Sequence, residues 1–462
     1  MRPVVTTAEM QVADAAAPVP VEVLVRRAGW AVAVGAARLL GRSYGARVVV
    51  VAGKGNNGAD GRAAAAVLAR RGAGVDVVDA GSLPAGTRLP PADLVIDAAY
   101  GTGFRGEYGP PDPGPAPVLA VDIPSGVQGD TGAVRGGALP AALTVTMAAL
   151  KPGLLLGDGP GRSGRVEVAD IGLPVGVPAA HLVEDADLAW IPPRPRAAHK
   201  WMGAVWLVAG SSGMRGAAGL CARAALRSGS GMVHTGSPGV GADEHPLGEA
   251  VAVGLPAAGW DVTVAGELAR FRALAVGPGL GRTDAVREGV RRLLSTTTVA
   301  AVVDADGLWA LGGVAEAAAV VGARPAAAGP VVLTPHDGEF ARLAGAPADE
   351  DRIGSVRDLA AATGAVVLLK GPTTVVADPA GAVLLAAAGD ARLATPGTGD
   401  VLTGVVAALL AGGFDGLRAA ALGAHVHGRA ALLGPPVGLV AGDLPDLLPR
   451  VLGGTARAEG HP

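Results

Sequence analysis

The chain has 462 residues, half of them hydrophobic, which predicts two or three domains with large apolar cores. A formal net charge of −3 and a sequence pI of about 6.3 exclude a nucleic-acid binder that depends on bulk positive charge. One cysteine cannot form an intramolecular disulfide, and we expect neither a signal peptide nor a membrane span, so we expect a cytoplasmic protein.

Residue usage decides which motifs carry information. Glycine supplies 73 residues, so a lone G-x-G-x-x-G match is expected by chance. Only four lysines accompany 34 arginines, and only two asparagines occur, side by side at Asn56 and Asn57. The rare residue types are therefore the better guides to a functional site.

The first part of the chain alternates short apolar runs with alanine-rich helical stretches. We expect a helix over 59–72, and we expect strands over 47–53, 74–80, 93–99, 117–123 and 143–149. Continuous apolar strands separated by helices predict a parallel sheet that is covered on both faces, a three-layer α/β/α domain.

A proline- and arginine-rich stretch at 191–199 interrupts this pattern and is the expected linker. A second α/β series follows it, with helices expected over 216–229 and 397–413. Its strands are expected over 204–210, 271–277, 299–307, 331–335 and 365–371. We therefore expect two separate α/β domains, over residues 1–190 and 197–455.

The stretch GKGNNGADG (53–61) lies between an expected strand and helix, where open α/β sheets bind ligands. Its glycines let backbone N–H groups approach a phosphate or sugar, and paired asparagines can bind a hard cation and a polar ligand. The alternative is a plain turn, since Asn-Gly is a common turn dipeptide.

Asp97 and Asp122 close two further strands of this domain, and Ser125 follows the second of them. If those strands are neighbours, the three side chains and the asparagine pair form an oxygen-rich pocket for a hard cation. One carboxylate would then be free for acid–base work. The alternative is that each aspartate only caps a turn or helix.

Four segments within residues 1–190 resemble the NAD(P)HX epimerase domain: GKGNNGADG, VIDAAYGTGFRGEYG, VLAVDIPSGVQGDTG and LTVTMAALKPGLLLGDGPGRSGRVEVADIGLP. This resemblance implies a Rossmann-like fold that interconverts the R and S epimers of hydrated NADH and NADPH, with a bound potassium ion. It implies Asp122 as the acid–base residue and Asn57, Asp97 and Ser125 as potassium ligands. Substrate contacts are implied at Asn56, Asn57, Gly58, Ala59, Asp60, Gly101, Thr102, Gly103, Phe104, Arg105, Gly106, Glu107 and Asp122.

The second candidate site is GTGD (397–400), which opens a predicted helix. Backbone N–H groups there form an anion pocket, and Asp400 beside it is a suitable base for a substrate hydroxyl. The alternative is that Asp400 caps its helix. Lys370 ends an expected strand, and because lysine is rare in this chain it indicates a specific role. His336 follows another strand and is either a ligand contact or a helix-capping or surface residue.

Residues 197–450 resemble the ribokinase-like ADP/ATP-dependent NAD(P)HX dehydratase, through HKWMGAVWLVAGSSGMRGAAGLCARAALRSGSGMV, LAVGPGLGR, VVDADGLWAL, LTPHDGEFARL, VVLLKGPTTVV and ATPGTGDVLTGVVAALLAGG. The resemblance implies removal of water from the S hydrate at the expense of ADP or ATP, with magnesium and with Asp400 as catalytic residue. It implies substrate contacts at Ala217, Gly279, His336 and Asp400. It implies nucleotide contacts at Lys370, Gly371, Pro372, Thr373, Thr374 and Gly399.

Two residues depart from the family patterns. Ala59 replaces a usual glycine and would crowd the backbone if its position needs a positive φ. Pro396 removes one N–H before the anion pocket. The main prediction is a bifunctional nicotinamide-nucleotide repair enzyme that acts on NADHX and NADPHX. We expect a homo-oligomer, with no nucleic-acid or membrane partner. The alternative is a ribokinase-like small-molecule kinase with a non-catalytic N-terminal binding module.

Overall fold

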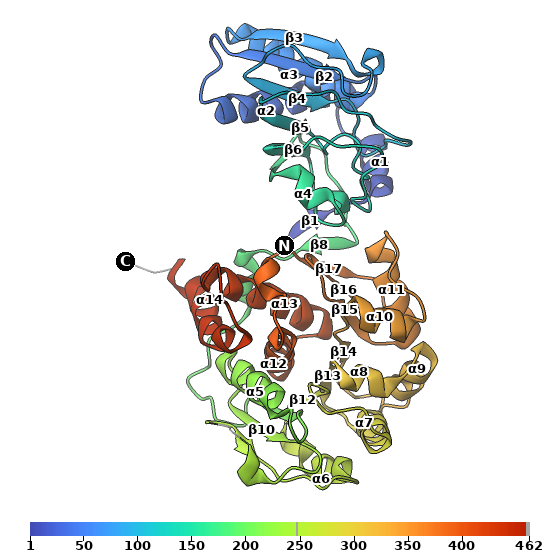
Figure 1. Ribbon diagram of the computed structural model, residues 1–462, viewed down its shortest axis with the longest axis vertical. Coiled ribbons are helices and arrows are strands. Elements are labelled where there is room, and N and C mark those ends of the chain that lie inside the picture. Colours follow the sequence, from blue (N-terminus) through green and yellow to red (C-terminus); the bar gives the residue numbers. More distant parts are fainter. Residues whose placement is uncertain (246–247, 459–462) are drawn as a thin grey trace. The chain divides into compact units, whose positions relative to one another are not determined.

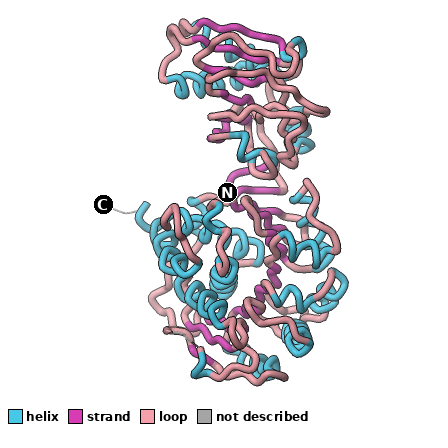
Figure 2. The backbone as a smooth tube through the Cα atoms, in the orientation of Figure 1, coloured by secondary structure: helices cyan, strands magenta, loops and turns pink. Residues whose placement is uncertain are grey.

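The computed structural model describes residues 1–245 and 248–458, and the chain divides into two compact units (Figures 1 and 2). The first unit is Arg2–Ala180, and the second is His181 onward together with Met1. This division precedes the stretch at 191–199 that we expected as the linker. The reason is that Val183 and Leu188 are buried in the core of the second unit.

The first unit contains a parallel sheet of order β3-β2-β4-β5-β6-β7. Its helices are α1 (Thr7–Ala15), α2 (Val21–Leu40), α3 (Asn56–Arg70) and α4 (Gly159–Ser163), with 3₁₀ turns at Ala80–Ser82 and Pro152–Leu154. Its strands are β1 (Arg2–Val4), β2 (Arg47–Ala52), β3 (Gly74–Asp79), β4 (Leu94–Ala98), β5 (Val118–Val121), β6 (Leu143–Met147) and β7 (Arg165–Ala169).

Alternation along β2 explains how this sheet is covered. Val48 and Val50 share a core with residues of α2 and α3, whereas Val49 and Val51 face a second core formed by the segments after β3 and β4. All five expected strands are present. The expected helix over 59–72 begins earlier, at Asn56, because Gly55 caps it, so the asparagine pair forms its first turn.

The second unit contains helices on both faces of a larger sheet. Its helices are α5 (Arg215–Arg227), α6 (Trp260–Glu267), α7 (Asp284–Thr296), α8 (Asp306–Leu311), α9 (Val314–Gly322), α10 (Asp337–Ala344), α11 (Arg352–Thr363), α12 (Thr398–Ala411), α13 (Gly416–Leu433) and α14 (Leu444–Ala458). Its strands are β8 (Ala180–Leu182), β9 (Ala204–Val208), β10 (Met232–Gly236), β11 (Val251–Ala252), β12 (Ala273–Val276), β13 (Ala300–Val303), β14 (Val331–Leu333), β15 (Val366–Leu369), β16 (Thr374–Ala377) and β17 (Val383–Ala386). Its 3₁₀ turns are Asp185–Trp190, Ala242–Glu244, Leu268–Arg270, Ala391–Leu393 and Ala441–Asp443.

The strands of this unit follow the order β8-β17-β16-β15-β14-β13-β12-β9-β10-β11. Pairing is parallel from β15 through β11 and antiparallel between β15, β16 and β17. Figure 1 shows α5, α12, α13 and α14 on one face of the sheet and α7 to α11 on the other. Within the described ranges, every helix is too short or too polar to cross a bilayer.

Close packing of α12 on α5 positions the start of α12. A Cβ atom at Gly404 would lie 2.2 Å from the carbonyl oxygen of Cys221, so only glycine permits this approach. Both helices belong to one buried core, which includes Ala218 and Val405. The close approach of α12 to α5, and with it the position of the GTGD turn, therefore depends on the absence of a side chain at residue 404.

We expect Gly404→Ala to lower the free energy of unfolding of the second unit by about 1–3 kcal/mol, because the added methyl group meets backbone. Gly219→Ala on α5 is the matched control. No atom lies within 4 Å of its added Cβ, so we expect a gain of about 0.5–1 kcal/mol. Urea unfolding followed by tryptophan fluorescence measures both, and equal stabilities would contradict the packing argument.

Candidate active sites

A cavity of about 640 Å³ lies at the carboxyl ends of β2, β4 and β5. Its lining includes Asn56, Asn57, Asp60 and Asp122, together with residues 101–104 and apolar side chains of α2. The structure thus brings the asparagine pair and Asp122 to one site, as the strand-end argument predicted. The wall after β4 is fixed by stacking of Tyr100 on Phe104, with ring centroids 4.5 Å apart.

Beneath this cavity, Asp97 and Ser125 form a buried network. The Ser125 hydroxyl donates to Asp97 Oδ1 at 2.6 Å, and the Ser125 backbone N–H donates to Asp97 Oδ2 at 2.9 Å. Ser125 Oγ also accepts from the backbone N–H of Tyr100 at 2.9 Å. Burial raises the pKa of the Asp97 carboxyl, and the hydrogen bonds from Ser125 oppose that rise.

Asn57 lies next to this network. A Cβ atom added at Gly101, the residue after Tyr100, would be 3.5 Å from Asn57 Oδ1. Both polar atoms of the Asn57 side chain are buried and lack a hydrogen-bond partner among the described residues. Such atoms are costly unless a ligand or ion satisfies them, so the donor set fits a hard cation such as potassium.

Asp122 sits at the tip of β5 with its carboxylate oxygen Oδ1 saturated. Oδ1 accepts from Lys151 Nζ at 2.5 Å, from the Thr146 hydroxyl at 3.0 Å and from the Met147 backbone N–H at 3.2 Å. Lys151 is 1% exposed, and its ammonium group also donates to Thr146 and to the Met147 carbonyl. Oδ2 of Asp122 therefore remains available to a ligand in the cavity.

The backbone of Asp122 is strained, with φ at 66°, a region that non-glycine residues rarely occupy. Strain of this kind persists where the surroundings over-determine the conformation, which is common at active sites. The three hydrogen bonds to Oδ1 supply that constraint.

Other expected residues of the first unit divide into two groups. Gly101, Thr102, Gly103 and Phe104 line the cavity, whereas Arg105, Gly106 and Glu107 are exposed and lie outside its lining. Gly58 packs on the carbonyl of Gly53. Ala59 lies inside α3, where its N–H donates to Gly55 O at 3.0 Å, and its φ is not positive. The expected crowding at Ala59 is therefore wrong.

The second site is the amino end of α12. Gly397 caps this helix with φ at 92°, which favours glycine, and the N–H groups of Gly399 and Asp400 precede the first intrahelical bond from Val401. Neither N–H group has a hydrogen-bond acceptor in the part of the chain that the structure describes, so both can bind an anion, and Pro396 lies before this group of donors. The expected loss of a donor at Pro396 thus does not touch these two N–H groups.

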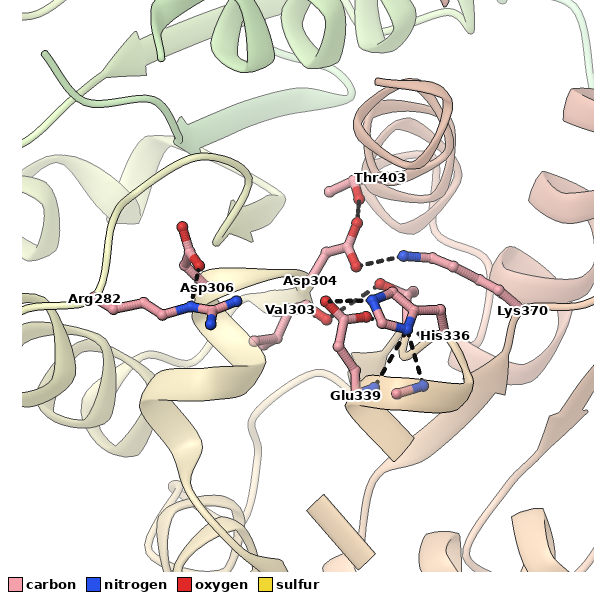
Figure 3. A network of polar contacts seen from close by, with 10 residues as sticks. Arg282, Val303, Asp304, Asp306, His336, Glu339, Lys370 and Thr403 are labelled. Atoms are coloured by element: carbon pink, nitrogen blue, oxygen red, sulfur yellow. Dashed lines mark hydrogen bonds and ion pairs between the residues drawn. The ribbon is translucent and has the colours of Figure 1, made fainter. Parts of the chain in front are cut away.

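A partly buried ion pair lies next to this helix end (Figure 3). Lys370 Nζ donates to Asp304 Oδ1 at 2.6 Å, and the Thr403 hydroxyl donates to Asp304 Oδ2 at 2.7 Å. A Cβ atom at Gly399 would lie 3.5 Å from Lys370 Nζ, so the lysine sits against the GTGD turn.

The half-buried carboxyl of Asp400 belongs to the same cluster. Burial, and then the negative charges of Asp304 and Asp306, raise the pKa of Asp400 to about 6, while Lys370 opposes the rise. Asp306 itself is paired with Arg282 at 2.9 Å. An aspartate in this range is ionised at neutral pH yet basic enough to accept a proton.

Ala217 and Gly279 lie side by side near this helix end. Gly279 has φ at 63°, and a Cβ there would lie 3.1 Å from that of Ala217. Its carbonyl accepts from the Ser211 hydroxyl at 2.9 Å. A Cβ at Gly397 would touch Leu220, one turn further along α5. These contacts bring the turn after β12 and α5 to the GTGD site.

His336 adopts the capping role that we weighed as its alternative. Its Nδ1 accepts from the N–H groups of Gly338 and Glu339 at 3.0 and 3.3 Å, which caps α10. The ring is 60% exposed, so Nε2 can still meet a ligand. The backbone ties this turn to the Lys370 segment, because Lys370 N–H donates to Pro335 O at 2.9 Å.

The Lys370–Thr374 segment links β15 to β16. Gly371 and Pro372 are exposed, Thr374 is half-buried, and Thr373 is buried. The stretch therefore presents backbone and small side chains to solvent immediately beside Lys370.

Sequence reasoning missed two residues that organise these sites, Lys151 and Asp304. The signal for Lys151 was present, because the rarity of lysine, which we used for Lys370, applies equally to it. Asp304 follows β13 within VVDADGLWAL, a segment quoted above for its resemblance only. An aspartate at a strand end was the criterion used in the first unit, and it would have found Asp304.

Comparison with known proteins agrees with this geometry. A family model described as NAD(P)H-hydrate dehydratase matches residues 205–449, and one described as YjeF-related protein N-terminus matches residues 21–89 and 80–153. A ribokinase-like superfamily protein from Enterococcus faecalis has a TM-score of 0.51 at 22% identity, covering 60% of this chain and 96% of its own. The predicted fold class is confirmed.

Two relatives match nearly the whole length. The bifunctional NAD(P)H-hydrate repair enzyme Nnr of Mycobacterium tuberculosis is 41% identical over 436 residues, covering 88% of each chain. The enzyme of that name from Moorella thermoacetica is 38% identical over 520 aligned positions, covering 97% of this chain and 96% of its own. With both halves matched in the expected order, this chain belongs to the family of bifunctional NAD(P)H-hydrate repair enzymes.

Proposed function

We propose that each unit carries out one half of NAD(P)H-hydrate repair through a single key carboxylate. The first unit epimerises NADHX and NADPHX with Asp122 as acid–base residue. The second unit dehydrates the S hydrate with Asp400 as base, at the expense of ADP or ATP. What carries the proposal is that Asp122 lines a cavity and Asp400 lies beside a helix amino end.

In the first unit, Lys151 holds the Asp122 carboxylate in place through Oδ1, and Oδ2 accepts and returns a proton while the configuration at C6 is inverted. Asn56, Asp60 and residues 101–104 line the same cavity and bind the ring and its amide. The apolar side chains of α2 line the same cavity and pack against the ring.

Potassium is held in this proposal by Asn57, Asp97 and Ser125. The buried and unpartnered Asn57 amide next to the Asp97–Ser125 pair supports that choice. A monovalent cation held there would supply positive charge beside the buried Asp97 carboxyl and Gly101.

In the second unit, the N–H groups of Gly399 and Asp400 bind the transferring phosphoryl group, and Lys370 adds positive charge nearby. Asp400 takes the proton of the C6 hydroxyl as that oxygen bonds to phosphorus and the nucleotide P–O bond breaks. Departure of phosphate with loss of a C5 proton then restores the ring double bond. The nucleotide lies along Lys370–Thr374. Ala217, Gly279 and His336 contact the substrate, and magnesium bound with the nucleotide would balance the phosphate charge.

We expect Asp122→Asn to lower the epimerisation rate by about 10²–10⁴-fold, because the amide cannot accept a proton. Epimer ratios of purified (R)-NADHX, followed without nucleotide, measure this rate. The dehydratase rate of the same variant should equal that of the wild type. Loss of both activities together would contradict separate sites.

We expect Asp400→Asn to lower the ADP- or ATP-dependent recovery of NADH absorbance by about 10²–10⁴-fold, with epimerisation intact. Accumulation of a stable phosphorylated product by the wild-type protein would instead favour the alternative kinase function.

The wild-type dehydratase rate should fall as pH drops through about 6, since Asp400 must be ionised to act as base. The charge of Asp304 raises the pKa of Asp400, so Asp304→Asn should move that fall to lower pH. Asp358→Asn, an exposed change on α11, is the control and should leave it in place. An unmoved acid limb in Asp304→Asn would contradict the coupling.

A further inference from the structure

Asp60 is a further carboxyl group of the epimerase cavity, and the proposed mechanism so far uses it only for binding. It lies in α3, is 9% exposed, and reaches the cavity from a different element than Asp122. The helix packs closely on β4 here, because a Cβ at Gly61 would lie 2.4 Å from that of Ala98. This close packing places the Asp60 carboxyl group at the cavity wall.

The walls of the cavity differ in the titratable groups that they place near Asp60. The α2 side of the cavity contributes apolar residues, and α1, the loops and the strand ends contribute the titratable groups Asp14, Lys54, Asp79, Tyr100 and Asp122, with Lys151 behind them. Lys151 is hydrogen-bonded to Asp122, and Lys54 is exposed. Within the described residues, the Asp60 carboxyl has neither a hydrogen bond nor an ion pair.

The carboxyl groups of Asp60 and Asp122 therefore lie in different electrostatic environments. Burial, and then the negative charges of Asp122 and Asp14, raise the pKa of Asp60 to about 8, with Lys151 opposing. Asp60 thus carries a proton at neutral pH, whereas the Asp122 carboxylate is bonded to an ammonium group. Two carboxyls whose environments separate their proton affinities form an acid–base pair.

We propose that Asp60 is the general acid of epimerisation, working opposite Asp122. The Asp60 proton moves to the C6 hydroxyl, the C6–O bond breaks, and water leaves as the N1 lone pair forms an N1=C6 iminium. Water then adds to the other face of C6, its proton passes to Asp122, and the electron pair returns to N1. One proton has moved from Asp60 to Asp122, and the reverse epimerisation returns it. This inference rests on the proposed role of Asp122.

The test compares Asp60→Asn, Asp60→Glu, Asp122→Asn and wild type, using (R)-NADHX without nucleotide. We expect Asp60→Asn to lower kcat by about 10²-fold with KM changed by less than about threefold, and Asp60→Glu to recover part of the loss. The wild-type rate should fall above pH about 8, where Asp60 loses its proton, and the residual rate of Asp60→Asn should lack that fall. Asp76→Asn, an exposed change on β3, should behave as wild type.

The outcomes separate this inference from the proposed function. Loss of activity in both Asp60→Asn and Asp122→Asn, with the alkaline limb absent from the former, supports the acid–base pair. If Asp122→Asn loses activity but Asp60→Asn keeps the wild-type kcat or alkaline limb, the role of Asp60 is overturned and that of Asp122 stands. Wild-type rates in both variants would overturn the proposed epimerase site itself.

Isotope labelling tests the C–O cleavage on which the proposed role of Asp60 depends. Epimerisation by wild-type protein in ¹⁸O-water should place one ¹⁸O at C6 for each inversion, because the hydroxyl leaves as water. Inversion without ¹⁸O incorporation would overturn the proposed C–O cleavage.

Discussion

Both sites depend on one interaction: a lysine ammonium group bonded to an aspartate at the end of a parallel strand. Lys151 holds Asp122 in the first unit, and Lys370 holds Asp304 in the second. A carboxylate in such a place is costly unless it is paired and hydrogen-bonded, and in both cases a threonine hydroxyl completes the set. The pairs fix these carboxylates in position.

The negative charge of each paired aspartate in turn raises the pKa of a neighbouring carboxyl group. In the first unit, the charge of Asp122 adds to burial in raising the pKa of Asp60. In the second, Asp304 acts in the same way on Asp400. Each site therefore combines a carboxylate locked to lysine with a second carboxyl of raised pKa, which is the combination that acid–base chemistry at neutral pH requires.

Glycines decide where these groups sit. Gly58 and Gly61 let α3 press against the ends of β2 and β4, and Gly404 lets α12 press against α5. In each case a side chain would collide with backbone or a neighbouring Cβ. The two departures from family pattern leave the helices regular, because Ala59 lies inside α3 and Pro396 precedes the start of α12.

By itself, the sequence determined the alternating α/β architecture, the strands that carry the sites and the family. These conclusions came from local features that the sequence alone shows: continuous apolar strands, the asparagine pair and GTGD. Only the tertiary structure decided which charged groups lie next to one another. The partners Lys151 and Asp122 are 29 residues apart, and Lys370 and Asp304 are 66 apart, so strand order alone brings them together. Burial, which raises the pKa of Asp60 and Asp400, is likewise a property of packing and has no local signature.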